Sequence, residues 1–420
     1  MPKNLLTFLL SAVLLISFPG CRVLKFGLFY LSKNHQKPRY HVSTLTPDSS
    51  HTFQFRVGDP ALQAQIAEAD FNGTTLEAYL TDKTATTAFL VIRNDSLIYE
   101  GYYGEYQQAS ILPSFSVAKS FTSALMGIAL AEGLIASIED PVTAYLPELA
   151  PLDSNWSLLK IEHLLDMRSG LDFNEDSYAN PYADIASLYL KKDALKFISK
   201  ARFSHRPGTH HYYSSQDTQI LGLIIERVTG RPLAEYLEQK IWRPLGMEYP
   251  ATWYLDSKKS GHNKAFCCLQ VAARDYAKFG RLFLNGGSWQ GKQIIDPAWV
   301  ARSVEPNFEN DCYQNQWYSG GRSFLYKEKE EGGGSEIWYF SDSLSATAVI
   351  ENQIYSRVLK SQKYPGQWYV RTCGPQFYAL GIFGQEIYVE PQRNLIFVRL
   401  GEKWDLNNHR AFAAVIRALE

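Results

Sequence analysis

The sequence lacks an excess of either charge, a cysteine framework and, beyond its first residues, a long hydrophobic run. Its 42 Lys and Arg residues are balanced by 43 Asp and Glu residues, so the net charge is −1. Without a basic stripe we expect no nucleic-acid partner, and without an acidic tail we expect no strongly charged protein partner. The composition, 45% hydrophobic and 14% aromatic over 420 residues, allows a large core and two domains.

Several catalytic and metal-binding motifs are also missing. No C-x-x-C, H-E-x-x-H or histidine cluster indicates a metal site, so neither a metal nor a cofactor is expected. No G-x-S-x-G occurs, which argues against an α/β-hydrolase with a Ser-His-Asp triad. The adjacency of Cys267 and Cys268 disfavours a bond between them, whereas Cys312 and Cys373 could pair in an oxidising compartment.

The N-terminus is apolar and does not look like part of the fold. Residues 1–21, "MPKNLLTFLLSAVLLISFPGC", hold one Lys, an apolar run too short for a comfortable membrane span, and small residues before a cysteine. This resembles a bacterial lipoprotein signal with Cys21 as the lipidated residue, although an ordinary secretory signal or an uncleaved anchor would also fit. We expect a membrane-anchored protein of the bacterial cell envelope, facing the periplasm or the exterior, with residues 22–50 as a tether.

Strand-like segments lie towards both ends of the chain and helical segments lie between them. One hairpin is predicted around Asn94-Asp95 within 87–106, and a second around "PQR" within 384–401. Apolar periodicity predicts helices over 116–133, 214–230, 272–287 and 407–420. This order predicts an α/β (α+β) fold, an antiparallel sheet flanked by helices from both chain ends, plus an inserted helical domain. The expected boundaries are 51–139 and 301–420 for the two parts of the α/β domain and 140–300 for the helical domain.

A serine and a lysine three residues apart, Ser116 and Lys119, begin the first of these helices. Both side chains fall on one helix face, and the helix N-terminus offers unpaired N–H groups and a partial positive charge. That field, with burial, favours a neutral lysine that can accept the serine proton. The alternative is an N-cap serine beside a surface lysine. A second such pair, Ser157 and Lys160, has no comparable setting and is expected to be a solvated surface pair.

Two later stretches add candidate groups. Tyr213 follows a turn set by Pro207 and Gly208 and directly precedes a helix, so it is either a core aromatic or a proton carrier. Small residues surround Ile382 on a late strand, where an exposed backbone N–H could complete an oxyanion hole with the N–H of Ser116.

Together these motifs resemble the serine β-lactamase and penicillin-recognising superfamily, whose Ser-x-x-Lys element "SVAK" matches. Over roughly residues 75–418 the chain is most similar to class C-like serine hydrolases of the 6-aminohexanoate-dimer hydrolase and family VIII esterase type. The stretches that carry this resemblance are "PGTHHYYSSQDTQILGLIIERVTG", "EHLLDMRSGLDF", "FCCLQVAARDYAKFGRLFLNGG" and "GQEIYVEPQRNLIFVRL". The resemblance implies a β-lactamase/transpeptidase-like fold.

The resemblance also implies roles for individual residues. Ser116 would be the nucleophile, Lys119 its base, Tyr213 the catalytic tyrosine, and Ile382 an oxyanion donor. Ser215 stands where the family's Tyr-x-Asn element has Asn, which contacts the substrate amide, so Ser215 is a candidate substrate-binding residue.

On the late strand "IFG" stands in place of Lys-Thr-Gly, so Phe383 would offer the substrate an apolar wall, unless Arg371 from another loop supplies a cation. Tyr178, within "NEDSYANPY", is a candidate for contact with a scissile amide, and the segment 320–365 could shape the pocket entrance.

The sequence therefore predicts a serine hydrolase that cleaves a small ester or amide through an acyl-enzyme on Ser116. The alternative is a catalytically idle, envelope-anchored binding protein that keeps the fold. The natural substrate and the oligomeric state stay open.

Overall fold

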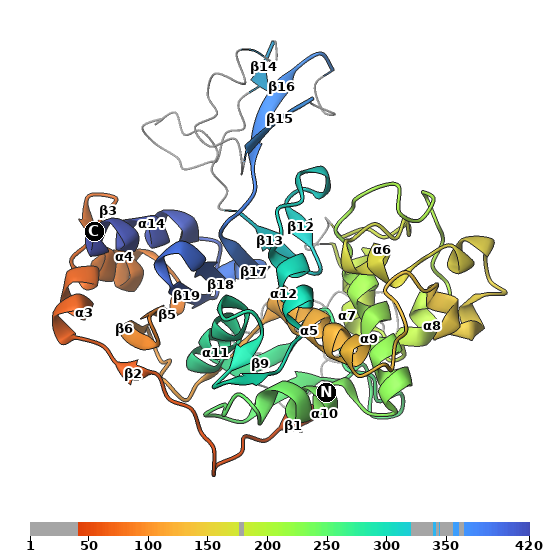
Figure 1. Ribbon diagram of the computed structural model, residues 1–420, viewed down its shortest axis with the longest axis horizontal. Coiled ribbons are helices and arrows are strands. Elements are labelled where there is room, and N and C mark those ends of the chain that lie inside the picture. Colours follow the sequence, from red (N-terminus) through yellow and green to blue (C-terminus); the bar gives the residue numbers. More distant parts are fainter. Residues whose placement is uncertain (1–40, 176–179, 321–338, 342–343, 345–355, 361–364) are drawn as a thin grey trace, which may run out of the picture.

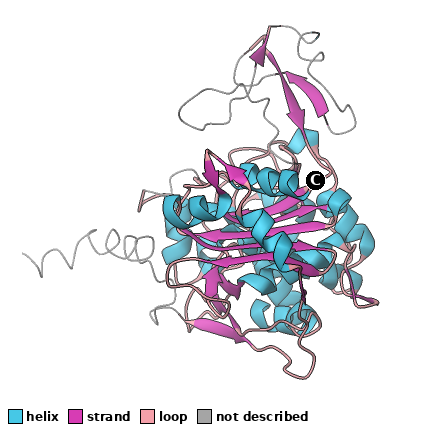
Figure 2. Ribbon diagram, turned by 90° about the vertical axis from the view of Figure 1, so that its left-hand side faces the viewer, coloured by secondary structure: helices cyan, strands magenta, loops and turns pink. Residues whose placement is uncertain are grey.

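The computed structural model consists of an eight-stranded sheet covered by helices on both faces, with a helix-rich lobe beside it (Figure 1). Figure 2 shows the sheet between its helical layers. The structure describes residues 41–175, 180–320, 339–341, 344, 356–360 and 365–420.

The large sheet is built from both ends of the chain. Its strand order is β12-β13-β17-β18-β19-β5-β6-β2, and all neighbours are antiparallel except β2 and β6. The predicted fold class is confirmed. The strands are β2 (Arg56–Val57), β5 (Thr86–Arg93), β6 (Ser96–Tyr102), β12 (Tyr313–Gln314), β13 (Trp317–Ser319), β17 (Phe377–Gly381), β18 (Gln385–Glu390) and β19 (Leu395–Gly401).

The central strand β5 alternates its side chains between two separate cores, as the pleat requires. Leu90 and Ile92 join the core under helix α11, whereas Phe89 and Val91 join the core under helices α3, α4 and α14. Burial on both faces explains why β5 reads as an unbroken run of apolar and β-branched residues. The covering helices are α3 (Pro60–Ala67), α4 (Leu76–Lys83), α11 (Ala273–Leu284) and α14 (Asn408–Leu419).

Local signals in the sequence form the expected turns. Asn94 and Asp95 both have positive φ, 51° and 61°, as the two-residue turn between β5 and β6 requires. Helix α9 (Ser215–Thr229) ends at Gly230, whose φ of 64° closes the helix in the left-handed region. These two turns set where the neighbouring elements stop.

The helical lobe packs around α5 (Ala118–Ala131) and α9, which lie in contact. Because residues 118–129 of α5 are all buried, this helix forms the centre of the molecule. The other helices are α6 (Ile161–Leu165), α7 (Asp184–Leu190), α8 (Ala194–Ile198), α10 (Leu233–Leu237) and α12 (Pro297–Val304). Short helical turns are η2 (Val142–Ala144), η3 (Pro147–Leu149), η4 (Ser154–Ser157), η5 (Glu238–Trp242), η6 (Phe308–Asn310) and η8 (Pro391–Arg393).

A second sheet, ordered β1-β8-β9-β7, differs from the expected organisation. Residues 22–50 were expected to be a tether. Part of this range instead forms strand β1, because its backbone pairs with β8. Strands β8 and β9 lie within residues 140–300, which were expected to be helical, and α11 from that range packs on the large sheet. The strands are β1 (Val42–Leu45), β7 (Ile111–Pro113), β8 (Ala251–Tyr254) and β9 (Leu269–Ala272).

Three small sheets complete the description. The sheet β14-β16-β15 stands away from the main body in Figures 1 and 2. Within the described ranges, no helix combines the length and the apolarity needed to cross a bilayer. The strands are β3 (Asp70–Phe71), β4 (Thr74–Thr75), β10 (Ser288–Trp289), β11 (Lys292–Gln293), β14 (Tyr339–Phe340), β15 (Ser356–Lys360) and β16 (Trp368–Thr372).

Candidate active site

Ser116 lies in a tight turn directly before the central helix α5. The turn is η1 (Phe115–Val117), which begins one residue before the predicted helix start at residue 116. Phe115 has a positive φ of 43°. The preceding residue, Ser114, is held by strand β9: its N–H donates to the Leu269 carbonyl at 2.8 Å, and the Leu269 N–H donates back to Ser114 Oγ at 3.2 Å. These two bonds hold the chain just before Ser116, which is itself half-buried.

Lys119 lies one turn further on, with a side chain that is only 1% exposed. Its Nζ donates to Ser116 Oγ at 3.0 Å, to Ser215 Oγ at 3.0 Å and to the Phe266 carbonyl at 3.1 Å. Burial lowers the pKa of Lys119 to about 8, against the opposing charges of Glu175 and Asp217. Lys119 therefore loses its proton more readily than a surface lysine does, so its neutral form is more available as a base.

Tyr213 lies beside the same two groups. Lys119 Nζ is 4.9 Å from the centre of the Tyr213 ring. Burial raises the pKa of Tyr213 well above its ordinary value, so the phenol stays neutral and can donate its proton. The ring meets Tyr313 edge-on at 5.9 Å, which packs it against the large sheet.

Ser215 and Glu175 lie behind the lysine. Ser215 is 1% exposed, and its Oγ donates to Glu175 Oε1 at 2.7 Å while its N–H donates to Glu175 Oε2 at 2.8 Å. Ser215 thus forms hydrogen bonds with Lys119 and Glu175, whereas the sequence analysis predicted that it contacts the substrate. Glu175 was missed, because a glutamate in a loop resembles a solvated charge; only its place in "NEDSYANPY" pointed to this region.

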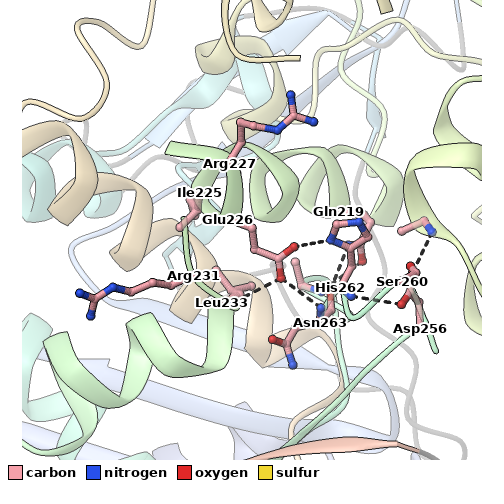
Figure 3. Close-up of polar contacts among 12 residues, drawn as sticks. Gln219, Ile225, Glu226, Arg227, Arg231, Leu233, Asp256, Ser260, His262 and Asn263 are labelled. Atoms are coloured by element: carbon pink, nitrogen blue, oxygen red, sulfur yellow. Dashed lines mark hydrogen bonds and ion pairs between the residues drawn. The ribbon is translucent and has the colours of Figure 1, made fainter. Parts of the chain in front are cut away.

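The loop that supplies the Phe266 carbonyl is tied to α9 (Figure 3). Gln219 on α9 donates to the Asn263 carbonyl at 3.0 Å and accepts from the Ala265 N–H at 3.1 Å. Two turns further along α9, Glu226 bonds His262 Nδ1 at 2.6 Å, and this bond raises the pKa of His262. Two of the three groups that contact Lys119 Nζ, Ser215 Oγ and the Phe266 carbonyl, are therefore held on or by α9.

The end of strand β17 closes against the serine turn. A Cβ added to Gly381 would lie 2.6 Å from the Ser114 carbonyl oxygen and 3.1 Å from the Ser116 nitrogen, so only glycine allows this approach. Ile382 follows at once, as the first residue of the turn η7 (Ile382–Gly384). The end of strand β17 at Gly381 therefore lies next to the Ser116 amide, one residue before Ile382.

The buried guanidinium of Arg399 holds the turn η7 through a hydrogen bond. Phe383 has a positive φ of 64°, its carbonyl accepts a hydrogen bond from the guanidinium of Arg399, and its ring meets Phe115 edge-on at 5.4 Å. Arg399 is fully buried and also pairs with Asp405 at 3.3 Å.

These contacts correct the expected position of the Lys-Thr-Gly triplet. The glycine packed against the serine turn is Gly381, whereas Gly384, the last residue of the predicted triplet position Ile382–Gly384, faces Arg399.

A comparison with known families now bears on this arrangement. The model of the family described as "Beta-lactamase" matches residues 73–419. The chain belongs to the β-lactamase family. It is a hydrolase with the β-lactamase/transpeptidase-like fold of that family.

Individual relatives are consistent with this assignment. The chain is 30% identical over 290 residues to the 6-aminohexanoate-dimer hydrolase of Paenarthrobacter ureafaciens, covering 63% of this chain and 72% of that one. It is 30% identical over 183 residues, 38% of this chain and 41% of the other, to an Escherichia coli K12 protein provisionally named D-alanyl-D-alanine carboxypeptidase. A Bacillus anthracis structure provisionally named 6-aminohexanoate-dimer hydrolase has a TM-score of 0.70 and 22% identity, covering 96% of this chain and 95% of that chain.

Other residues singled out in the sequence lie elsewhere. Tyr178 and Cys21 fall outside the described residues. The Arg371 guanidinium pairs with Asp311 and donates to the Phe308 carbonyl at 3.3 Å. Of the second Ser-x-x-Lys pair, Ser157 is exposed. Among the described residues, no group of three His, Cys, Asp or Glu could hold a metal ion.

The cysteines form two disulfides. Cys312 and Cys373 are bonded, with Cα atoms 5.3 Å apart. The expectation that adjacency keeps Cys267 and Cys268 apart is wrong, because these two are also bonded to each other. Cys268 adopts a positive φ of 70°, a backbone conformation that sequence reasoning did not anticipate at this position. The pair immediately follows the Phe266 carbonyl that Lys119 contacts.

Proposed function

We propose that this chain hydrolyses an ester or amide bond through a covalent acyl-enzyme on Ser116. The observation that carries the proposal is the buried amine of Lys119, whose Nζ lies 3.0 Å from Ser116 Oγ and whose pKa is lowered to about 8. Such an amine is partly neutral near neutral pH and can take the serine proton. The similarity to an amide hydrolase supports the ester-or-amide class.

Acylation begins when Ser116 Oγ bonds to the substrate carbonyl carbon while its proton passes to Lys119 Nζ. The carbonyl electron pair moves onto oxygen, which becomes negatively charged. The N–H groups of Ser116 and Ile382 donate to this oxygen, and the N-terminal end of α5 adds a favourable field. The result is a tetrahedral intermediate beside a lysine ammonium.

Tyr213 then completes acylation. Its neutral phenol donates a proton to the leaving oxygen or nitrogen as the bond to carbon breaks, and it regains a proton from the Lys119 ammonium. Lys119 is neutral again when the acyl-enzyme has formed. In deacylation, water gives a proton to Lys119 as the water oxygen attacks the acyl carbon. The bond from the acyl carbon to Ser116 Oγ then breaks, and Ser116 Oγ takes the proton back from the Lys119 ammonium, which leaves Lys119 neutral.

The substrate is one that carries no carboxylate beside the scissile bond. Ala379 and Leu380 precede Gly381 on strand β17 and offer neither the cation nor the hydroxyl with which relatives that bind such a carboxylate hold it. The nearby Arg399 is buried and committed to the Phe383 carbonyl and to Asp405. A neutral ester, or an amide whose charges lie farther away, avoids the cost of an unpaired carboxylate.

The site of action that we propose is the bacterial cell envelope, with Cys21 as a lipid anchor. Two disulfides support an oxidising compartment, where such bonds persist. Replacing Cys21 by Ala is expected to move the protein from the membrane fraction to the soluble envelope fraction. Unchanged membrane retention would point instead to a protein anchor.

Labelling with a fluorophosphonate probe tests the catalytic proposal. The wild-type protein should be labelled, Ser116→Ala should not, and Ser157→Ala, the matched change at the exposed second Ser-x-x-Lys pair, should be labelled like the wild type. A catalytically idle binding protein would show no labelling at all. Competition of the labelling by a panel of esters, D-amino-acid amides and short amide oligomers then ranks the substrate classes.

A further inference from the structure

Lys119 can act as a base only if its lone pair points at Ser116. An amine nitrogen has three positions besides its bond to Cε, and here Ser116 Oγ, Ser215 Oγ and the Phe266 carbonyl occupy them. When the ammonium loses one proton, two N–H groups and one lone pair remain to be distributed among these three neighbours. Which neighbour receives the lone pair decides whether the serine can be activated.

Two of the three neighbours can be assigned from their chemistry. The Phe266 carbonyl has no hydrogen, so it can only accept an N–H. Ser215 has one hydroxyl hydrogen, but this hydrogen is donated to Glu175 Oε1 at 2.7 Å. The second carboxylate oxygen accepts the Ser215 N–H at 2.8 Å, which fixes the carboxylate against the start of α9. Ser215 Oγ therefore faces Lys119 as an acceptor, and it too requires an N–H.

We propose that Glu175 is a positioning residue which, by taking the hydroxyl hydrogen of Ser215, directs the lone pair of neutral Lys119 at Ser116 Oγ. Only Ser116 can then reverse its hydrogen bond and donate to Nζ. This inference rests on the proposed acyl-enzyme chemistry and names the group that orients its base. Glu175 itself is 3% exposed and does not touch the reacting atoms.

Among the described residues, three titratable side chains lie around Lys119 or affect its pKa. From α9 and the turn before it come Asp217, whose carboxyl accepts from Ser169 Oγ at 2.8 Å, and Tyr213. From the loop after α6 comes Glu175. The negative charge of Glu175, and that of Asp217 when it is ionised, raise the pKa of Lys119 against the larger effect of burial, while burial raises the pKa of Asp217 itself to about 8. Removing the Glu175 charge should therefore make Lys119 lose its proton at a lower pH.

Glu175→Gln separates orientation from charge. The Ser215 N–H can only donate, so the amide oxygen turns towards it and the amide NH₂ faces Ser215 Oγ. Ser215 then keeps its own hydrogen free and can donate it to the Lys119 lone pair. We expect the pH-independent plateau of kcat/KM to fall by about 10- to 100-fold, part of what a positioned base supplies, while the acid limb moves to lower pH.

A loss of packing alone would not move the acid limb to lower pH while lowering the plateau. The matched control is Asp217→Asn. Asp217 is a second buried acid near Lys119, but it lies on α9 and accepts a hydrogen bond from Ser169 instead of Ser215. Its plateau should stay within about threefold of the wild type, the scatter expected for a change that leaves the base oriented.

Ser215→Ala and the double variant complete the cycle. Because Glu175 acts through Ser215, Ser215→Ala should also lower the plateau, and adding Glu175→Gln should cost no more than about threefold further. The proposal is overturned if Ser215→Ala keeps the wild-type plateau, whether or not Glu175→Gln folds. It is also overturned if Glu175→Gln costs as much in the Ser215→Ala background as in the wild type.

Ester turnover and fluorophosphonate labelling of the wild type and of Ser116→Ala are measured in parallel. If the wild type neither turns over nor is labelled, the proposed function fails. If the wild type is active and Ser116→Ala is not, the result for the Glu175 and Ser215 variants tests the orientation alone.

Discussion

Replacing Gly381 by Ala tests the proposed oxyanion hole with one added methyl group. That methyl would stand 2.6 Å from the Ser114 carbonyl oxygen, whereas ordinary contact begins at 3.4 Å. Strand β17 must therefore retreat by roughly 0.8 Å, and the N–H of Ile382 moves with it. Because Gly381 has an ordinary φ of −125°, backbone strain does not contribute.

Loss of one oxyanion donor lowers kcat by about 10²- to 10³-fold in comparable enzymes, and we expect Gly381→Ala to approach that range with a small change in KM. The assay is kcat for p-nitrophenyl butyrate, corrected for the folded fraction by thermal denaturation. The control is Gly280→Ala on α11. Its added Cβ would lie 2.8 Å from the Cγ2 of Ile387, which belongs to the same sheet but lies away from the serine. A kcat for Gly381→Ala within about threefold of the wild type would refute the oxyanion role of this strand end.

Three further outcomes are expected. The kcat/KM of the wild type should fall about tenfold per pH unit below the Lys119 pKa of about 8, since the base must be neutral; a flat profile from pH 6 to 8 would contradict this. Tyr213→Phe keeps the ring packing and should lower kcat by about 10²- to 10⁴-fold, so a wild-type rate would make Tyr213 a core aromatic only. A chromogenic cephalosporin should have a specificity constant about 30- to 150-fold below those of p-nitrophenyl acetate and butyrate, because about 2–3 kcal/mol of carboxylate contacts are lost. Equal constants would disprove the argument that an apolar wall stands in place of these contacts.

The parts of the fold that could be predicted carry local signals. The turn at Asn94-Asp95 and the helix end at Gly230 each depend on residues that tolerate positive φ, and both occur where expected. Strand β1 could not be predicted, because its pairing with β8 joins positions about 200 residues apart and no local pattern announces it. The bond between Cys267 and Cys268 escaped prediction for a different reason: it depends on a backbone conformation, the positive φ of Cys268, that the sequence does not disclose.

The candidate site divides in the same way. Ser116 and Lys119 lie one helical turn apart, so their proximity follows from spacing alone. Tyr213 was identified by resemblance, and the structure brings it to the same point. The Phe266 carbonyl contacts Lys119 from one loop and Glu175 contacts Ser215 from another, and neither a backbone oxygen nor a loop carboxylate has a periodic or compositional signature.

The mixed origin of the large sheet has a consequence for how the enzyme is made. The serine turn and β5 are synthesised early, but β19, which lies against β5 along its whole length, comes from residues 395–401. Until the ribosome has added that strand, β5 presents an unpaired apolar edge, the kind of surface that invites misassembly and calls for chaperones. A premature stop before residue 395 would leave Ser116 and Lys119 in a chain whose central sheet cannot close.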